Sequence, residues 1–472
     1  MKNALLIFAF LSFYLSSVHA SVEIRSNKLT TGDGLANNSI RYMFQDSKGF
    51  MWMGTVNGLS YYDGNSFVSI YPDPNLPISL ADPRIRNMEE DSNGFLWIAT
   101  LSSLYSCYDL KHGRFVDFTG CGEYKQSYSK KIIASDQSIW LWDNNNGCRR
   151  VVYQDGQFSS QAYKKELGNL SSDEVLFVYE SNDSPGHVWI GTKQGLWKYH
   201  DGKLEAMDTQ GESWEHIFSY DQYTCIITGK KEIYRHSLSN NRLEKIASLT
   251  ELGDTGVITG SLRLQHQWVM FTATGSYILD PVTGKLRRFS RLNIKNGNVT
   301  RDNKGNAWVH NYTGNVWYVN TSTGDIKHFQ FLSSEHLGYI DVERYSIIHD
   351  SRDIIWITTY GNGLFAYDLN TGDLQHFTFE VSHSSHINSN YLQYIIEDRS
   401  GGIWVSSEFS GLSHLEILNK GTLRIYPNGE DASDRSNTIR MLLRGKNGNV
   451  YMANRMGTLY EYDADLKNIL RR

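Results

Sequence analysis

The sequence predicts an all-β protein made of β-propeller blades, with one closed seven-bladed propeller followed by about three blades of a second, incomplete propeller. Three observations predict this class. A ten-residue phrase at residues 46–55, D-S-K-G-F-M-W-M-G-T, returns almost unchanged at residues 91–100 and recurs in worn form along the chain. Aromatic residues make up 13% of the 472 residues. Glycine outnumbers proline by 40 to 7, which is typical of short turns between strands.

The recurring phrase predicts one strand-rich unit at each appearance. Ten copies occur, and their centres lie 36 to 49 residues apart. The central residues are Trp52, Trp97, Trp140, Trp189, Cys225, Trp268, Trp308, Trp356, Trp404 and Tyr451. A catalytic motif normally occurs once, whereas copies at a fixed period indicate a repeat architecture.

Each part of the phrase has a role in a four-stranded blade. Asp46 and Asp91 are expected to accept hydrogen bonds from backbone amides just ahead, and Gly49 and Gly94 to finish a short hairpin in the left-handed conformation. The apolar run that follows suits a strand buried on both faces. Four antiparallel strands in roughly 45 residues form a propeller blade. The tryptophan is expected to pack between blades, where its burial contributes about 3 kcal/mol.

Ten blades do not suit a single ring, because propellers usually close with about four to eight. The spacing is irregular through the seventh copy and nearly constant afterwards. Residues 22–29 read as a strand without a blade of its own, which could complete the seventh blade. We therefore expect a closed propeller over residues 21–324 and a partial one over residues 325–472; eight-plus-two and six-plus-four divisions are the alternatives.

Three blades would leave an open sheet edge, which is a liability in solution. Either another chain completes them or the sequence is a piece of a longer protein, and we favour the second explanation.

The N-terminus resembles a secretory signal peptide. Lys2 precedes an almost wholly apolar run over residues 4–15, and Ala20 offers a small residue at the expected cleavage site. The run is too short to span a bilayer. We therefore expect residues 1–20 to be removed and the remainder to be soluble and periplasmic. In that oxidising compartment Cys107, Cys121, Cys148 and Cys225 could form up to two disulfides with any of three connectivities, although Cys225 also suits a buried apolar position.

Charge and motifs exclude several functions. The net charge is −5 with both signs mixed along the chain, which gives no basic footprint for nucleic acid or for an anionic membrane. No metalloprotease, hydrolase, Walker or dinucleotide-binding motif occurs, so we expect neither an enzyme nor a cofactor. His383 and His386 have a metal-ligand spacing, but a surface loop is the favoured interpretation.

Binding is a more plausible role for the innermost strands. Five positions before the turn, these strands carry Arg41, Arg86, Tyr345 and Gln393, and Arg440 matches them in the tenth copy. We expect these side chains near one end of the central channel, where planar donors and aromatic rings suit a sugar. The favoured alternative is that they bond to the backbone of neighbouring blades.

The first copy, extended to D-S-K-G-F-M-W-M-G-T-V-N-G-L-S-Y-Y-D, resembles the regulator-propeller repeat of bacterial two-component sensors. The opening L-T-T-G-D-G-L-A-N-N-S-I and the loop Y-P-D-P-N-L-P-I-S-L share this likeness, which is closest to the periplasmic sensor half of hybrid systems. In that family two seven-bladed propellers precede a β-sandwich, a transmembrane helix, a histidine kinase and a response regulator.

The resemblance implies sensing of an extracellular carbohydrate, often an oligosaccharide released from a polysaccharide. It implies a parent anchored in the inner membrane, allows a homodimer through the sensor region, and makes the kinase half a missing partner. Two alternatives remain. A glycan lyase or glycosidase would need converging carboxylates, and a protein-interaction scaffold would need an exposed apolar patch.

Overall fold

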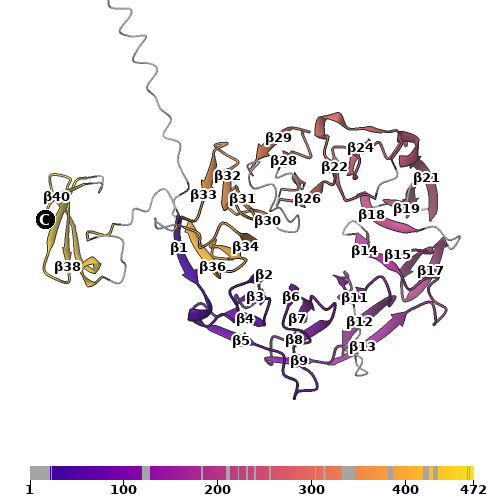
Figure 1. The fold of residues 1–472 in the computed structure, drawn as a ribbon, viewed down its shortest axis with the longest axis horizontal. Helices are drawn as coiled ribbons and strands as arrows, with labels where there is room; N and C mark the ends of the chain where they lie inside the picture. Colours follow the sequence, from indigo (N-terminus) through magenta and orange to yellow (C-terminus); the bar gives the residue numbers. More distant parts are fainter. Residues whose placement is uncertain are drawn as a thin grey trace, which may run out of the picture. The chain divides into compact units, whose positions relative to one another are not determined.

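Four-stranded antiparallel sheets are the main regular structure of the computed structural model (Figure 1). The structure describes residues 22, 24–119, 128–181, 184–208, 213–221, 223–229, 232–238, 241–254, 257–302, 304–311, 315–331, 346–380, 386–417, 425–428, 434–464, 466 and 468–472. In these ranges there are ten such sheets and no α-helix. The predicted all-β propeller class is confirmed. No helix in the described ranges is long and apolar enough to cross a membrane.

Each sheet is a meander of consecutive strands, with one exception described below. The strands of the first five sheets are β2 (Ile40–Gln45), β3 (Met51–Thr55), β4 (Leu59–Tyr62) and β5 (Phe67–Ile70); β6 (Ile85–Glu90), β7 (Phe95–Thr100), β8 (Tyr105–Asp109) and β9 (Arg114–Val116); β10 (Lys130–Ile133), β11 (Ile139–Trp142), β12 (Cys148–Gln154) and β13 (Gln157–Tyr163); β14 (Val175–Ser181), β15 (Ser184–Thr192), β16 (Gly195–His200) and β17 (Lys203–Asp208); β18 (Trp214–Asp221), β19 (Thr224–Gly229), β20 (Glu232–Ser237) and β21 (Arg242–Ser248).

The strands of the other five sheets are β22 (Gly260–Leu264), β23 (Gln267–Phe271), β24 (Ser276–Leu279) and β25 (Leu286–Arg288); β26 (Asn298–Arg301), β27 (Ala307–His310), β28 (Asn315–Val319) and β29 (Ile326–Gln330); β30 (Ser346–His349), β31 (Ile354–Thr358), β32 (Leu364–Asp368) and β33 (Leu374–Phe377); β34 (Leu392–Glu397), β35 (Ile403–Ser407), β36 (Leu412–Ile417) and β1 (Ile24–Leu29); β37 (Ile439–Arg444), β38 (Val450–Asn454), β39 (Leu459–Tyr462) and β40 (Ile469–Arg471). Short 3₁₀ turns cover Thr31–Asp33, Leu249–Leu252, Ser290–Leu292 and Arg435–Asn437.

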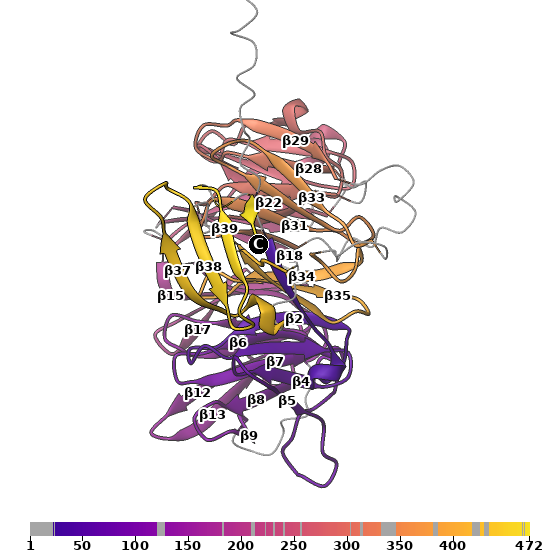
Figure 2. The same ribbon diagram turned by 90° about the vertical axis from the view of Figure 1, so that its left-hand side faces the viewer.

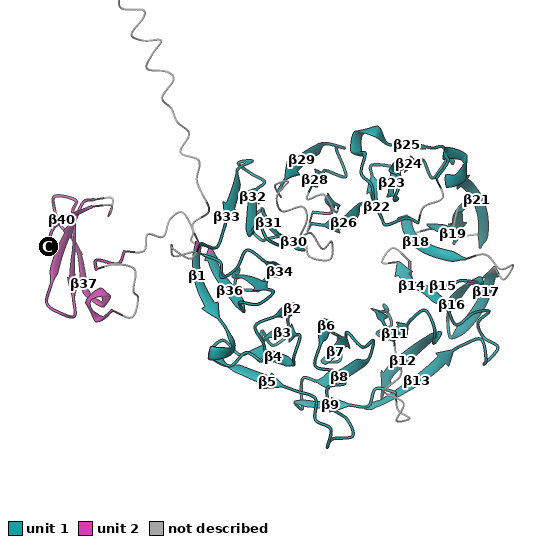
Figure 3. Ribbon diagram, in the orientation of Figure 1, with its two compact units in different colours: residues 1–21, 25–416 teal, residues 22–24, 417–472 magenta. Residues whose placement is uncertain are grey.

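The chain divides into two compact units (Figure 3). Unit 1 contains residues 25–416, and its nine described sheets follow one another around a ring (Figure 1). The first and ninth blades meet directly. The Ser406 hydroxyl donates to the Ile40 carbonyl at 3.1 Å, and an Arg399 guanidinium nitrogen donates to the Asp46 carbonyl at 2.6 Å. The ring therefore closes between residues more than 350 positions apart in the chain.

The strand that completes the ring is the exception to the meander rule. β1 pairs with β36, so residues 24–29 supply the fourth strand of the ninth blade. The expectation that residues 22–29 complete the seventh blade is wrong, and the compact units do not divide near residue 324. The physical reason is local: the seventh blade has its own fourth strand, β29, whereas the ninth has no fourth strand of its own among the described residues.

The core of unit 1 lies between neighbouring blades. Trp52 of the first blade packs with Ile85 and Ile98 of the second, and Trp404 of the ninth blade packs with Met43 and Met53 of the first. The predicted burial of the indoles is confirmed at all eight tryptophan centres, which are at most 5% exposed: Trp52, Trp97, Trp140, Trp189, Trp268, Trp308, Trp356 and Trp404.

The aspartate of the recurring phrase makes one hydrogen bond more than predicted. As expected, Asp91 Oδ1 accepts from the amides of Asn93 and Phe95, at 2.9 and 3.0 Å, and Gly94 is left-handed with φ 81°. Its second oxygen accepts from the Trp97 indole at 2.9 Å, six residues further on. The same indole bond is made from Trp52, Trp356 and Trp404 to the aspartates at 46, 350 and 398. We call this arrangement the Asp–Trp clamp.

The described cysteines do not form disulfides. Cys107, Cys148 and Cys225 are all buried, and burial raises the pKa of the Cys107 and Cys148 thiols. Cys121 lies outside the described residues. The interpretation of Cys225 as a small buried apolar side chain is confirmed, since it is 0% exposed.

Unit 2, residues 22–24 and 417–472, contains a single four-stranded sheet, of which Figure 2 shows β37, β38 and β39 side by side. Its first strand, β37, exposes Met441, Leu442 and Leu443 at 46%, 66% and 57%. Met43, at the position in the first blade that matches Leu442, is only 1% exposed. This sheet therefore presents an apolar face that the blades of unit 1 bury against each other.

Candidate functional site

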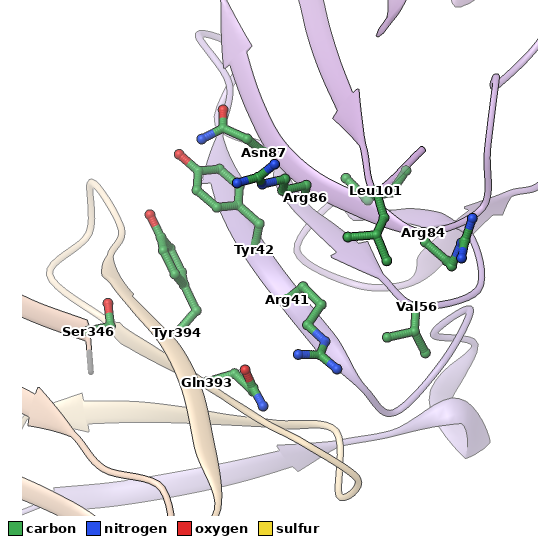
Figure 4. Close-up of a pocket in the computed structure, with 11 residues that line it drawn as sticks. Arg41, Tyr42, Val56, Arg84, Arg86, Asn87, Leu101, Ser346, Gln393 and Tyr394 are labelled. Carbon is green, nitrogen blue, oxygen red and sulfur yellow. The ribbon is translucent and has the colours of Figure 1, made fainter. Parts of the chain in front are cut away.

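Three of the predicted binding residues line one pocket of about 580 Å³ in unit 1 (Figure 4). Arg41 lies on β2, Arg86 on β6 and Gln393 on β34, the innermost strands of the first, second and ninth blades. The pocket therefore spans the junction where the ring closes, and Ser346 of the eighth blade also contributes to its wall.

Arg41 and Gln393 meet at one carboxylate. Arg41 Nη2 donates to Glu408 Oε1 at 3.2 Å, and the Gln393 amide donates to the other oxygen, Oε2. Glu408 is only 6% exposed, so its charge needs these partners. The interaction joins the first blade to the ninth. Arg41 thus engages a neighbouring blade, although through a side chain and not through the backbone contact that was expected, whereas Gln393 bonds to Glu408 within its own blade.

The two arginines of β6 and its preceding turn differ in their partners. Arg84 forms a bidentate pair with Asp82, with Nη2–Oδ2 at 2.8 Å and Nε–Oδ1 at 3.0 Å, and this pair lowers the pKa of Asp82 and raises that of Arg84. Arg86 is exposed and has no hydrogen-bond or ion-pair partner among the described residues. Its charge is felt on the next blade, because burial and the Arg86 guanidinium together lower the pKa of Lys130.

Two tyrosines provide the aromatic part of the pocket. The Tyr42 and Tyr394 rings lie 4.7 Å apart between centroids, tilted by 41°. Burial raises the pKa of both hydroxyls, and hydrogen bonds from Tyr394 and Asn87 oppose the rise at Tyr42. Both hydroxyls therefore stay protonated at neutral pH and can donate or accept hydrogen bonds. Figure 4 draws Tyr42, Arg86 and Asn87 beside one another.

The other predicted site residues do not line this pocket or lie outside the described residues. Tyr345 lies outside the described residues, and Arg440 lies on β37 of unit 2. His383 also lies outside the described residues, and the His386 ring lies edge-on to Phe377, 6.0 Å away between centroids. Within the described ranges no group of three His, Cys, Asp or Glu side chains is arranged to hold a metal ion.

Sequence reasoning missed Tyr42, Asn87 and Tyr394, which directly follow Arg41, Arg86 and Gln393 in the chain. Regular strands direct successive side chains to opposite faces. Here the ladder shifts register between Ile40 and Tyr42, and between Ile85 and Asn87. A β-bulge of this kind brings consecutive residues to one side. In the sequence, the only sign that these neighbours reach the pocket was an aromatic residue, Tyr42, directly after Arg41.

A match to a family model covers the first two copies of the phrase. The two-component regulator propeller model matches residues 34–57 and 79–102, segments that include Arg41 and Arg86. The predicted resemblance to regulator-propeller repeats is confirmed for these two segments. No curated protein matches the chain.

Solved structures with a similar fold include extracellular domains of bacterial signalling proteins. The extracellular domain assigned to the hybrid two component system BT3049 of B. thetaiotaomicron is 16% identical, with a TM-score of 0.37, over 96% of this chain and 66% of that one. A domain assigned to BT4673 of the same organism is also 16% identical, with a TM-score of 0.39, over 94% and 59%. The Dos1 propeller is 11% identical, with a TM-score of 0.49, over 83% and 94%. The chain thus spans about three fifths to two thirds of the two extracellular domains.

Proposed function

We propose that this chain, which carries regulator-propeller repeats at residues 34–57 and 79–102, is the exported ligand-sensing part of a two-component system. In this proposal residues 1–20 direct export to the periplasm, and the rest senses a carbohydrate. The signal passes to a histidine kinase outside this chain, in a parent anchored in the inner membrane and paired as a homodimer. The chain acts as a binding module and not as an enzyme.

The observation that carries the proposal is the composition of the pocket at the ring closure. It combines guanidinium groups, the amides of Asn87 and Gln393, and the rings of Tyr42 and Tyr394 within about 580 Å³. Sugars have apolar ring faces and outward hydroxyls, so they suit aromatic platforms flanked by planar hydrogen-bond donors. The volume suits a small oligosaccharide, because ligand pockets generally measure about 300–1,000 Å³.

Calorimetric titration of the mature chain, residues 21–472, against a panel of neutral and acidic oligosaccharides tests this function. Product analysis on the same samples separates sensing from catalysis. Saturable binding without turnover is the expected result. Turnover would instead identify the chain as a lyase or glycosidase. If no oligosaccharide binds, the proposal that the ligand is a carbohydrate is wrong.

A second candidate function has one observation in its favour. The exposed apolar strand β37 of unit 2 is the kind of surface that takes part in protein–protein contacts. A scaffold role predicts that the chain captures a protein partner while remaining silent in the oligosaccharide titration.

A further inference from the structure

The charge of the pocket is more specific than its shape. Three arginines line it, at positions 41, 84 and 86, and none of the described lining residues is acidic. Two of these cations are already compensated: Arg41 by Glu408, and Arg84 by the bidentate contact with Asp82. Arg86 is the arginine of the three that lacks a counter-ion among the described residues.

The surroundings of Arg86 add to its positive charge. The Lys130 ammonium, on the innermost strand of the third blade, donates to the Leu176 carbonyl at 3.2 Å and has no carboxylate partner among the described residues. The carboxylate of Glu89, on the same strand as Arg86, is engaged in an ion pair with Lys131. Among the described residues, Arg86 and Lys130 therefore carry positive charges without an ion-pair partner, whereas Arg41, Arg84 and Lys131 are each paired with a carboxylate.

The groups beside Arg86 suit a sugar that carries an anion. A guanidinium binds a carboxylate or sulfate through two parallel hydrogen bonds, which fixes its orientation as well as its charge. Tyr42 and Asn87 line the same pocket as Arg86 (Figure 4), so the Tyr42 ring can hold the apolar face of a sugar ring while the Asn87 amide binds a hydroxyl. A neutral sugar would leave the Arg86 charge unmatched.

We propose that Arg86 is the anion-recognition residue of this pocket and that the ligand is an acidic oligosaccharide bearing a carboxylate or sulfate group. This inference rests on the proposed function and narrows its substrate class. Carboxylate and sulfate share the chemistry that Arg86 recognises, and the experiment below includes both.

The test compares charged and uncharged forms of the same sugars by calorimetry on the mature chain. The probes are an oligogalacturonate with its methyl ester, and a heparin-derived oligosaccharide with its desulfated, carboxyl-reduced form. We expect at least one anionic form to bind, at least about tenfold more tightly than its neutral counterpart. Raising the salt concentration from 50 to 300 mM should weaken this binding, because part of the contact is a screened charge interaction.

Two arginine variants give the matched control. Arg86→Gln should lower affinity for the anionic form at least about tenfold. Arg114→Gln makes the same charge change outside the pocket, on β9, the strand of the second blade farthest from β6, and should change this affinity less than about threefold. Thermal unfolding of both variants should match that of the unmodified chain, since both side chains are exposed.

The outcomes separate the inference from the function on which it rests. Equal affinity for charged and neutral forms, or an Arg86→Gln variant that binds the anionic form normally, overturns the anion proposal and leaves carbohydrate sensing in place. Binding of neutral sugars alone does the same. If no oligosaccharide binds, charged or neutral, both the anion proposal and the proposed carbohydrate sensing are wrong.

Discussion

At the scale of single residues, the carboxylate of the Asp–Trp clamp ties a surface turn to a buried ring. Asp91 is 5% exposed and serves two backbone amides and one indole. The seventh copy of the phrase lacks the hydrogen bond between the indole and the aspartate. There the Asn306 amide donates to Asp302 Oδ2 at 3.1 Å, and the buried Trp308 indole has no acceptor among the described residues. The two tryptophans are equally buried, at 0% exposed, so they form a matched pair.

This pair predicts unequal costs for the same substitution. Trp97→Phe removes packing and also the bond to Asp91, whereas Trp308→Phe removes packing alone. Because a hydrogen bond to a charged group contributes roughly 1.5–3 kcal/mol, Trp97→Phe should lower the free energy of unfolding by about 2 kcal/mol more than Trp308→Phe. Equilibrium denaturation in urea measures both. Equal losses would mean that the clamp adds nothing beyond the turn it closes.

At the scale of elements, strand β3 must approach the innermost strand of the next blade closely. A Cβ atom added to Gly54 would lie 2.6 Å from Ile85 Cγ2 and 2.8 Å from Ile85 Cβ. Ile85 is itself 2% exposed, at the start of β6. The glycine of the phrase is therefore a packing requirement between blades at this position, while the second copy has Ala99 in the same place.

Gly54→Ala should consequently strain the contact between the first and second blades. Overpacking of this kind costs about 1–3 kcal/mol, and we expect a loss of that size in chemical denaturation. The control is Ala99→Gly at the matching position, where removing the methyl group should cost no more than about 1 kcal/mol. A Gly54→Ala variant as stable as the unmodified chain would show that the contact between β3 and β6 can accommodate an added methyl group.

The arrangement of the strands also explains why only part of the candidate pocket could be predicted from the sequence. Arg41, Arg86 and Gln393 could be identified because they hold one position relative to the turn in each copy, and three of the five predicted positions line the pocket. Tyr42, Asn87 and Tyr394 could not, because the bulges that bring them to the pocket depend on hydrogen-bond register. Glu408 follows β35, and only ring closure brings it to Arg41, 367 residues away.

At the scale of the whole molecule, the blades could be predicted but their closure could not. Every copy repeats the same strand pattern, so the sequence identifies blades such as those around Trp140 and Trp404 with equal ease. Where the ring closes depends on which blade lacks a fourth strand. β29 fills that place in the seventh blade, and β1 fills it in the ninth. A strand far from its partner in the chain leaves no local signal of this pairing.

The pairing of β1 with the ninth blade bears on the candidate site, because the pocket takes its walls from both sides of the closure. Arg25 on β1 lies 3.9 Å from Glu416 on β36, between Nη1 and Oε2, and both side chains are more than a third exposed. Lys304 and Asp353 form a similar contact, at 2.5 Å, between the seventh and eighth blades. This second pair provides an internal reference.

The most direct measurement is zero-length carbodiimide coupling of an R25K variant, which joins an amine to a carboxylate only where the two are in contact. Mass spectrometry of the digested protein should find the peptide of residue 25 joined to the peptide of Glu416, alongside the reference link between Lys304 and Asp353. If residue 25 instead couples to Asp325 of the seventh blade and not to Glu416, the ring closes elsewhere and the pocket between the first and ninth blades does not form.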